Sequence, residues 1–338
     1  MNPRIAANQQ RTFLAQLGQV LPHLARDSAL PRRIKELLAR NRALGSRDRR
    51  LYRELIYTAL RYLPWIQPVL ARDEARAAQL VAWLAPELRD TSAYRAALLE
   101  SWPQVPSTLV EKSRALREQF AAFRLQLESP LPPSDATAPT TQPLPSADSF
   151  LFDPPTLLPT WFRDHCPDAF VPPHLDALLA RAPLWVRLQV ADETLVLDEF
   201  ARRNWPAHRF AAWPDAFALP PNAEVAASDA YRRGFVEIQD LGSQLVLAHA
   251  PVAAGQTWLD ACAGAGGKTL QLARAVGDSG RVDATDIRPS MLEELRERAA
   301  RARLTNIQVG SPRETAYDGV LVDAPCSGSG TWRRLPHM

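Results

Sequence analysis

Thr257-Trp-Leu-Asp-Ala-Cys-Ala-Gly-Ala-Gly-Gly-Lys268 joins an apolar stretch to a helical pattern, and this joint decides the fold of the second half of the chain. Residues 257–261 read as a strand and residues 269–276 as a helix, with the glycine-rich loop between them. Glycine permits positive φ angles and close approach of a ligand to the backbone, and the helix start offers free N–H groups. Such a joint is typical of α/β sheets that wrap a nucleotide-like cofactor. Alone, the loop is a weak signal, and a tight strand-to-helix turn that binds nothing is the alternative.

The alternation of strand and helix patterns continues along the chain. Helices are predicted at residues 242–249 and 290–303, and further strands at 281–285, 306–309 and 318–322. Ser290 is the candidate N-cap of the second helix, with Glu293 three residues on as in a capping box. Alternating units of this size predict a parallel sheet with helices on both faces.

The spacing of the glycine loop narrows the choice of cofactor. Gly264, Gly266 and Gly267 do not fit G-x-G-x-x-G, and a phosphate-binding P-loop would need glycine in place of Cys262. Asp286 ends the second predicted strand, where a carboxylate can accept both ribose hydroxyls of a nucleoside cofactor. The alternative for Asp286 is a helix cap.

A second loop carries reactive side chains. Residues 318–330 read Asp-Gly-Val-Leu-Val-Asp-Ala-Pro-Cys-Ser-Gly-Ser-Gly, so an apolar run delivers Asp323 and then Cys326. Open α/β sheets place their chemistry at the carboxyl ends of their strands. A lone cysteine is more often a small buried hydrophobe, but Pro325 and Gly328 mark a loop here, which favours a functional role for Cys326.

The two loops, in this order, resemble those of the S-adenosylmethionine-dependent RNA cytosine-C5 methyltransferases of the RsmB-like (Fmu/Sun, NOP2/Sun) family. Arg47-Asp-Arg49 and the helical pattern after it look like the NusB-like domain of these enzymes. Residues 184–189 are similar to the family's W-hydrophobic-R-hydrophobic-N strand, with Gln189 replacing Asn, and residues 234–244 are similar to its G-x-x-x-x-Q-D-x-x-S-Q entry into the methyltransferase domain.

The resemblance implies S-adenosylmethionine as cofactor and RNA, ribosomal RNA above all, as partner. It implies catalytic roles for Cys326, Asp323 and Lys268. Lys268 is one of only three lysines in an Arg-rich chain, which indicates a specific use of its compact charge. The residues implied in cofactor binding are Cys262, Ala263, Gly264, Ala265, Gly266, Gly267, Lys268, Asp286 and Asp323.

The implied reaction needs more than one reactive group. Cytosine C5 becomes nucleophilic only after a thiolate adds at C6, and a carboxylate near N3 and the exocyclic amine stabilises the developing charge. After methylation the C5 proton is removed and the thiol leaves by β-elimination. In the family, the cysteine at the position of Cys326 assists product release, and a later Thr-Cys supplies the nucleophile.

Two departures from the family pattern affect the expected activity. The sequence contains no Thr-Cys and stops at Met338, so we expect a C-terminally truncated enzyme that is inactive alone. After the third strand, residues 309–312 read Val-Gly-Ser-Pro, where the family has an acidic contact to the adenine amine. Two other functions remain open: an RNA-binding protein with an incomplete methyltransferase fold, and a nicotinamide-dependent oxidoreductase.

The first third of the chain reads as helical and basic. Residues 1–61 carry thirteen Arg and Lys against four Asp and Glu, within a net charge of +3 for the chain. This basic arm indicates a polyanionic partner such as RNA; a solvated helix surface is the alternative. Pro64, Pro68, Pro86, Pro103 and Pro106 are expected to divide the region into several helices.

A length of 338 residues predicts two or three domains. We expect a helical NusB-like RNA-binding domain (1–128), a Pro-rich linker (129–149), a small α+β module (150–238) and the N-terminal part of the methyltransferase domain (239–338).

The composition excludes several classes of protein. Three widely spaced cysteines predict a reduced, cytoplasmic protein without disulfides, and the histidines form no metal-binding pattern. No apolar run is long enough to span a bilayer, and no signal peptide is recognisable. We therefore expect a monomer without a metal and without a membrane partner.

Overall fold

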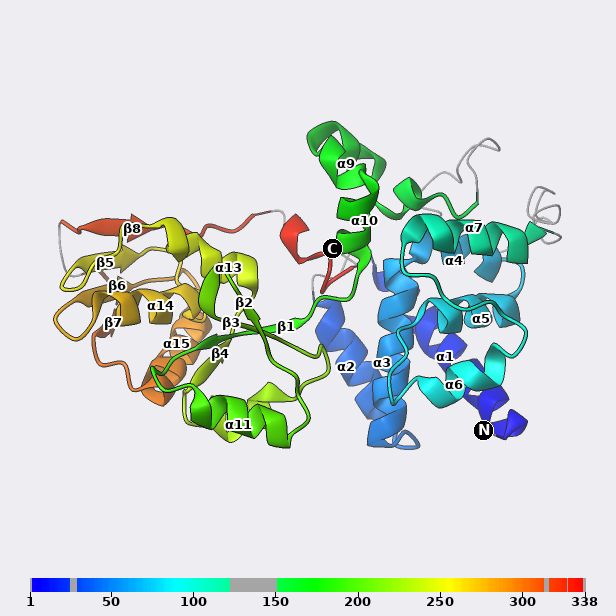
Figure 1. Cartoon of the computed structure of the whole chain (residues 1–338), viewed down its shortest axis with the longest axis horizontal. Helices are drawn as coiled ribbons and strands as arrows, with labels where there is room; N and C mark the ends of the chain where they lie inside the picture. Colours follow the sequence, from blue (N-terminus) through cyan, green and yellow to red (C-terminus); the bar gives the residue numbers. More distant parts are fainter. Residues whose placement is uncertain (1, 25–28, 122–150, 313–315, 327, 337–338) are drawn as a thin grey trace. The chain divides into compact units, whose positions relative to one another are not determined.

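The computed structural model describes residues 2–24, 29–121, 151–312, 316–326 and 328–336. The chain forms two compact units (Figure 1): residues 1–180 together with 328–338, and residues 181–327. Within the described residues, no helix has both the length and the apolar character that crossing a bilayer requires.

The first unit, which we call the helical unit, confirms the predicted helical character of the N-terminal region. Its α-helices are α1 (Pro3–Val20), α2 (Leu30–Arg40), α3 (Ser46–Arg61), α4 (Leu63–Leu70), α5 (Glu74–Leu84), α6 (Ser92–Leu98), α7 (Leu109–Gln119), α9 (Thr160–His165) and α10 (Pro172–Leu179).

Helix α3 shows why the helical pattern could be read from the sequence. Leu51, Leu55 and Ile56 are buried, and Arg53 lies exposed between them, as expected for an amphipathic helix. The helix begins at the predicted place, where the Gly45 N–H donates to Asp48 Oδ2 at 3.2 Å.

The proline pattern was only partly informative. Pro64 is in the first turn of α4, where its missing N–H costs nothing. Pro68, however, lies inside α4 and does not end it, so the prediction of a break there was wrong. The helix is only eight residues long, and its buried side chains Trp65, Ile66 and Val69 anchor both of its turns.

Residues 151–180 belong to the helical unit, although the sequence placed them with the α+β module. The reason is aromatic packing: the Phe152 ring lies 5.9 Å from Trp65 and 5.1 Å from Phe120, centroid to centroid. The Trp65 indole N–H also donates to the Asp153 carbonyl oxygen at 3.1 Å. The predicted linker, residues 129–149, lies outside the described residues.

The segment from Gly328 onward also packs within the helical unit. The Trp332 ring meets the Phe162 ring at 4.8 Å in an edge-on contact. A guanidinium N–H of Arg61 donates to the Arg333 carbonyl oxygen at 2.8 Å.

The second unit, which we call the α/β unit, opens with a four-stranded antiparallel sheet. The strands, in spatial order, are β2 (His208–Phe210), β3 (Trp213–Leu219), β1 (Leu184–Leu188) and β4 (Val236–Ile238). Helix α11 (Thr194–Arg202) covers it with the buried side chains of Val196 and Phe200. The strand expected at residues 184–189 is confirmed by β1, whereas β2 and β3 were missed.

A parallel sheet follows, as predicted. Its spatial order is β7 (Ile307–Val309), β6 (Arg281–Ala284), β5 (Thr257–Asp260) and β8 (Gly319–Leu321), visible side by side in Figure 1. The helices of this part are α13 (Leu241–Leu245), α14 (Gly267–Val276) and α15 (Pro289–Ala302). The predicted capping box was wrong, because α15 begins at Pro289 and Ser290 is inside the helix.

Both crossover helices lie on one face of this sheet. Side chains of α14 pack with Trp258 and Val282, and Leu295 of α15 packs with Ala284. Because the strand order advances in one direction from β5 through β6 to β7, right-handed crossovers require this arrangement. The prediction of helices on both faces was therefore wrong for the described residues. Val320 of the edge strand β8, on the opposite face, is 54% exposed.

Buried charges connect the antiparallel sheet to helix α15, which packs on the parallel sheet. Glu237 of β4 is fully buried and pairs with two arginines of α15, Arg298 at 2.9 Å and Arg301 at 2.6 Å. At Gly234 a Cβ would lie 2.2 Å from the Arg301 carbonyl oxygen, so the two backbones approach as closely as glycine allows. The sequence placed a domain boundary at 238/239, but no separation between compact units occurs there.

Candidate active site

The glycine loop is held in shape by its own backbone and by the second strand. The Ala263 N–H donates to the Thr285 carbonyl oxygen at 2.9 Å, and the Gly266 N–H donates to the Ala263 carbonyl oxygen at 2.9 Å. Gly266 has a φ of 87°, and a Cβ there would lie 2.8 Å from Cγ of Leu295. Both the left-handed conformation and the close approach to α15 therefore require glycine.

Asp260, the last residue of β5, holds the two ends of the glycine loop together. It is buried, and its Oδ2 accepts a hydrogen bond from the Thr269 hydroxyl at 2.7 Å, which links β5 to the first turn of α14. Burial raises the pKa of the Asp260 carboxyl above its usual value. Sequence reasoning missed this residue, although an acidic side chain that ends a buried strand was a signal for it.

Asp286 lies beside the glycine loop, as the resemblance implied. Its Oδ2 accepts from the Gly264 N–H at 2.9 Å, and its Oδ1 accepts from the backbone N–H and from Nε of Arg288 at 2.9 and 3.0 Å. The Arg288 hydrogen bonds, with that of Gly264, lower the pKa of Asp286 to about 2. The side chain is therefore an ionised acceptor at neutral pH, and carboxylate oxygens can accept further donors. Arg288 was missed, because nothing in the sequence pairs it with Asp286 specifically.

Lys268 connects the glycine loop to the Pro-Cys loop. Its Nζ lies 2.6 Å from Oδ2 of Asp323 and donates to the Ser243 hydroxyl oxygen at 2.8 Å. The lysine side chain is 11% exposed and that of Asp323 57%. The structure thus brings together two site residues that the sequence predicted, Lys268 and Asp323. Ser243 is an additional site residue, and it lies in the stretch that resembles the family's entry motif.

The three cysteines differ in accessibility. Cys326 is exposed, whereas Cys262 and Cys166 are partly buried. Within the described part of the chain, no hydrogen bond joins Cys326 to Lys268 or Asp323. No group of three His, Cys, Asp or Glu side chains with the geometry of a metal site occurs among the described residues.

The predicted site residues gather at one edge of the parallel sheet. Asp286 and Asp323 follow the carboxyl ends of β6 and β8, and β5, which ends at the additional residue Asp260, lies between these two strands in the sheet. The arrangement offers a partly buried glycine loop, an ionised acceptor beside it, and a lysine–carboxylate pair whose carboxylate lies in the loop that also carries an exposed thiol. These groups can bind a nucleoside-containing cofactor and polarise an uncharged ring.

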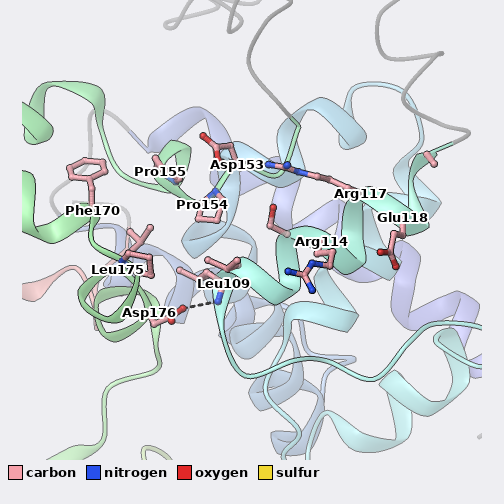
Figure 2. Close-up of a pocket in the computed structure, with 14 residues that line it drawn as sticks. Leu109, Arg114, Arg117, Glu118, Asp153, Pro154, Pro155, Phe170, Leu175 and Asp176 are labelled. Atoms are coloured by element: carbon pink, nitrogen blue, oxygen red, sulfur yellow. Dashed lines mark hydrogen bonds and ion pairs between the residues drawn. The ribbon is translucent and has the colours of Figure 1, made fainter.

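The helical unit contains a groove of a different kind. A volume of about 720 Å³ lies between α7, the segment around Asp153 and α10 (Figure 2). Two of its carboxylates have protein partners: Asp176 accepts from the Leu109 N–H at 2.7 Å, and Asp153 lies 3.8 Å from Arg117. None of the sequence-predicted site residues lines this groove, so we do not place the reaction there.

Comparison with known proteins gives a family match over the part of the chain that carries these candidate site residues. Residues 246–338 match the family model described as 16S rRNA methyltransferase RsmB/F. Ribosomal RNA small subunit methyltransferase B of Cronobacter sakazakii is 32% identical over 170 residues, which are 47% of this chain and 39% of the relative. The probable ribosomal RNA small subunit methyltransferase B of Bacillus subtilis is 33% identical over 164 residues, which are 46% of this chain and 36% of the relative. The chain thus spans about two fifths of the length of the curated relatives it matches.

A solved structure shows the same fold. The crystal structure of PH0851 superposes with a TM-score of 0.60 at 15% identity and covers 100% of this chain and 77% of that protein. At this identity the likeness concerns the fold alone. The family match, in contrast, includes the glycine loop, Asp286 and the Asp323–Cys326 loop. Residues 246–338 are therefore similar to the RsmB/F methyltransferases over the stretch that holds the glycine loop, Asp286 and the Asp323–Cys326 loop.

Proposed function

We propose that this chain carries the cofactor site and one catalytic cysteine of an enzyme that methylates C5 of cytosine in RNA, with ribosomal RNA as the substrate. The observation that carries the proposal is the Lys268–Asp323 ion pair, which couples the glycine loop to the Pro-Cys loop. S-adenosylmethionine, when bound, supplies an electrophilic methyl group. The rest of the chemistry belongs to side chains of the protein.

The glycine loop fits a nucleoside cofactor. Gly264 and Gly267 have no side chain and are only partly buried, so a ligand can approach the backbone of the loop at these two positions. Asp286 is an ionised acceptor beside this backbone and would hold the ribose hydroxyls. These contacts bind and orient the cofactor without taking part in bond making.

Asp323 and Cys326 would face the base. Asp323, held by Lys268, would accept hydrogen bonds from the exocyclic amine of cytosine and from a proton on N3, and that proton balances the electron pair that reaches N3 as a thiolate adds to C6. Activation itself is the addition of a thiolate to C6, after which C5 attacks the methyl group. Cys326 then assists removal of the C5 proton and departure of the first thiol by β-elimination.

The attacking thiol is the part of this mechanism for which the sequence offers no Thr-Cys motif. We therefore infer that the 338-residue chain alone does not turn over. The second candidate function follows from the same observation: an RNA-binding protein that uses an incomplete methyltransferase fold.

RNA contact is proposed for the helical unit, in the manner of a NusB-like domain. Its first sixty-one residues hold the excess of basic side chains. The exposed ones are Arg4, Arg11, Arg32, Arg33, Lys35, Arg40, Arg42, Arg47 and Arg53. An exposed basic surface of this kind attracts the phosphate backbone without regard to sequence.

Calorimetry on the 338-residue chain tests the cofactor part of the proposal. S-adenosylhomocysteine should release heat on binding, and nicotinamide adenine dinucleotide should not. Binding of the nicotinamide cofactor alone would favour the oxidoreductase.

The role of Cys326 needs a chain that carries both cysteines. In such a chain, Cys326→Ala should leave nucleophilic attack intact and block release, so that the protein remains covalently joined to RNA and runs slowly on a denaturing gel. The 338-residue chain should give neither an adduct nor methylated RNA. Robust methylation by that chain would overturn the need for a second cysteine and the role given to Cys326.

A further inference from the structure

Two carbonyl groups of the cofactor loop are held by buried arginines whose positions depend on the neighbouring antiparallel sheet. The carbonyl oxygen of Gly267 accepts from Nη1 of Arg187 at 3.0 Å, and that of Ala265 accepts from Nη1 of Arg298 at 2.8 Å. Neither contact could be predicted from the sequence, because each donor is at least thirty-three residues away along the chain.

Arg187 reaches the loop from the middle of the antiparallel sheet. It lies on β1, is buried, and donates through the same nitrogen to the side-chain oxygens of Gln239 and Gln271, the latter at 2.9 Å. Burial lowers the pKa of Arg187 to about 9 against the opposing effect of Glu237, so the side chain remains charged at neutral pH. A charged donor makes a stronger hydrogen bond to a carbonyl than a neutral donor does.

Arg298 reaches the loop from α15, and the antiparallel sheet fixes where it points. Both Nε and Nη2 of Arg298 donate to Oε2 of Glu237, at 3.2 and 2.9 Å, while Nη1 donates to Ala265. The carboxylate is fully buried, and the arginine side chain is 13% exposed. The guanidinium is planar, so a carboxylate that grips one edge sets the direction of the remaining N–H groups.

We propose that the antiparallel sheet is a positioning element for the cofactor loop: Glu237 fixes Arg298, and Arg298 and Arg187 hold the loop carbonyls in the conformation that the cofactor needs. This inference rests on the proposed cofactor site. Arg187 and Arg298 are positioning residues because they act through the loop carbonyls, and Glu237 is one because it acts through Arg298. A loop that is already set loses less conformational entropy on binding, and this raises affinity.

The chain offers a matched control for this idea. Arg301 also pairs with Glu237, at 2.6 Å, and its guanidinium lies over the Tyr231 ring, but its hydrogen bond goes to Glu237 and not to the loop. Arg298→Met and Arg301→Met each remove one of two arginines from the same buried carboxylate. Only Arg298→Met also removes the donor to the Ala265 carbonyl.

The experiment compares both variants with the unsubstituted 338-residue chain. The unfolding midpoint reports the structural cost of each substitution, and calorimetry with S-adenosylhomocysteine reports affinity well below that midpoint. We expect Arg298→Met to weaken affinity about tenfold and Arg301→Met less than threefold, at similar unfolding midpoints. Equal weakening by both variants, or weakening by neither, would overturn the proposal.

Amide hydrogen exchange on the ligand-free chain gives a reading that does not depend on the cofactor. Exchange at residues 263–267 should be faster in Arg298→Met than in Arg301→Met. If the unsubstituted chain binds no S-adenosylhomocysteine, the cofactor assignment fails and this comparison alone decides the positioning role. Equal exchange in the two variants would reject it. If Arg298→Met does not fold, Arg298→Lys serves instead, because its compact ammonium keeps a charge beside Glu237 but lacks the fork that also serves Ala265.

Discussion

The Nζ of Lys268 lies 2.6 Å from Oδ2 of Asp323, a residue fifty-five positions later in the chain. The contact joins the first turn of the helix after the glycine loop to the loop that carries the exposed thiol. The contact directly links the proposed cofactor site to the proposed site for the base.

Asp323→Asn should affect catalysis far more than stability. Because Asp323 is 57% exposed, loss of its ion pair should cost less than about 1 kcal/mol of unfolding free energy, measured in urea. In a chain that carries both cysteines, methyl transfer should fall roughly 100-fold or more, the scale for removing one electrostatic contact to a transition state. Asp229→Asn, which breaks the exposed pair with Arg232, is the control and should leave transfer unchanged. A large stability loss with intact transfer in Asp323→Asn would assign the pair a structural role.

Asp286→Ala should weaken the binding of S-adenosylhomocysteine by roughly 1–3 kcal/mol, the scale for leaving polar partners unmet. Its carboxylate is the acceptor beside Gly264, and its pKa of about 2 means that the affinity of the unsubstituted chain should not change between pH 5 and 8. Titration calorimetry measures both effects. Asp278→Ala, at an exposed position after α14, should bind like the unsubstituted chain. Unchanged affinity in Asp286→Ala would remove this residue from the site.

Asp260 predicts a pH dependence of stability with a definite sign. Burial raises its pKa in the folded state, so the folded chain holds the proton more tightly than the unfolded chain does. The contribution of this group to stability is therefore greatest below the unfolded pKa of about 3.9 and declines as the pH rises through the folded pKa. Asp260→Asn keeps an acceptor for Thr269 and cannot ionise.

The unfolding free energy of Asp260→Asn minus that of the unsubstituted chain should be larger at pH 7 than at pH 4. Chemical unfolding at the two pH values measures this difference. A difference between variant and parent that stays constant with pH would show that Asp260 has the same proton affinity in both states.

Gly266→Ala should destabilise the α/β unit more than Gly255→Ala does. Both glycines have positive φ angles, 87° and 83°, so both substitutions carry backbone strain. At Gly266 the new methyl group would also lie 2.8 Å from Leu295 and 3.0 Å from Leu270, whereas at Gly255 the nearest atom, the Ser279 hydroxyl oxygen, would be 3.7 Å away. Overpacking of this kind typically costs about 1–3 kcal/mol, and the difference between the two unfolding free energies should fall in that range. Similar losses for the two variants would mean that α15 moves aside freely.

RNA binding by the helical unit should depend steeply on salt. Replacing Lys35, Arg42 and Arg47 with Gln should reduce the log–log salt slope for a ribosomal RNA fragment by about 2, because each phosphate contact contributes roughly 0.7–0.9. Substitution is preferable to deletion of residues 1–61, since Phe13, Leu55 and other side chains of this segment lie in the core of the unit. Gln at Arg202, Arg232 and Arg303, exposed in the α/β unit, is the control. Equal salt slopes in the unsubstituted chain, the triple variant and the control would show that these basic side chains are hydrated and make no contact with RNA.

Local patterns in the sequence predicted the site well because its parts are local. The glycine loop, Asp286 and Asp323 each end a strand whose apolar pattern is visible in a few residues, and parallel strands bring their carboxyl ends to one edge. The lysine at position 268 was conspicuous because arginine is the rule elsewhere in this chain. Its pairing with Asp323 followed from the fold and not from the sequence.

The parts that were missed depend on distant partners. Strand β3 contains Pro214 and has an irregular register with β2, so its pattern does not alternate cleanly. Phe152 joins the helical unit through rings more than thirty positions away, which no local pattern records. Arg187 and Glu237 look like surface charges in the sequence, yet each is buried and hydrogen-bonded to residues far along the chain.

The buried pairing of Glu237 with Arg298 and Arg301 also determines how this protein can be recombined. A chimera that exchanges everything after residue 238 for the same region of a relative would separate a buried carboxylate from its two arginines, and breaking such a pair costs about 3–5 kcal/mol. A cut at residue 180 crosses none of these contacts. The antiparallel sheet and the parallel sheet therefore have to be exchanged as one piece. A chimera designed to change substrate specificity should replace residues 181–327 together.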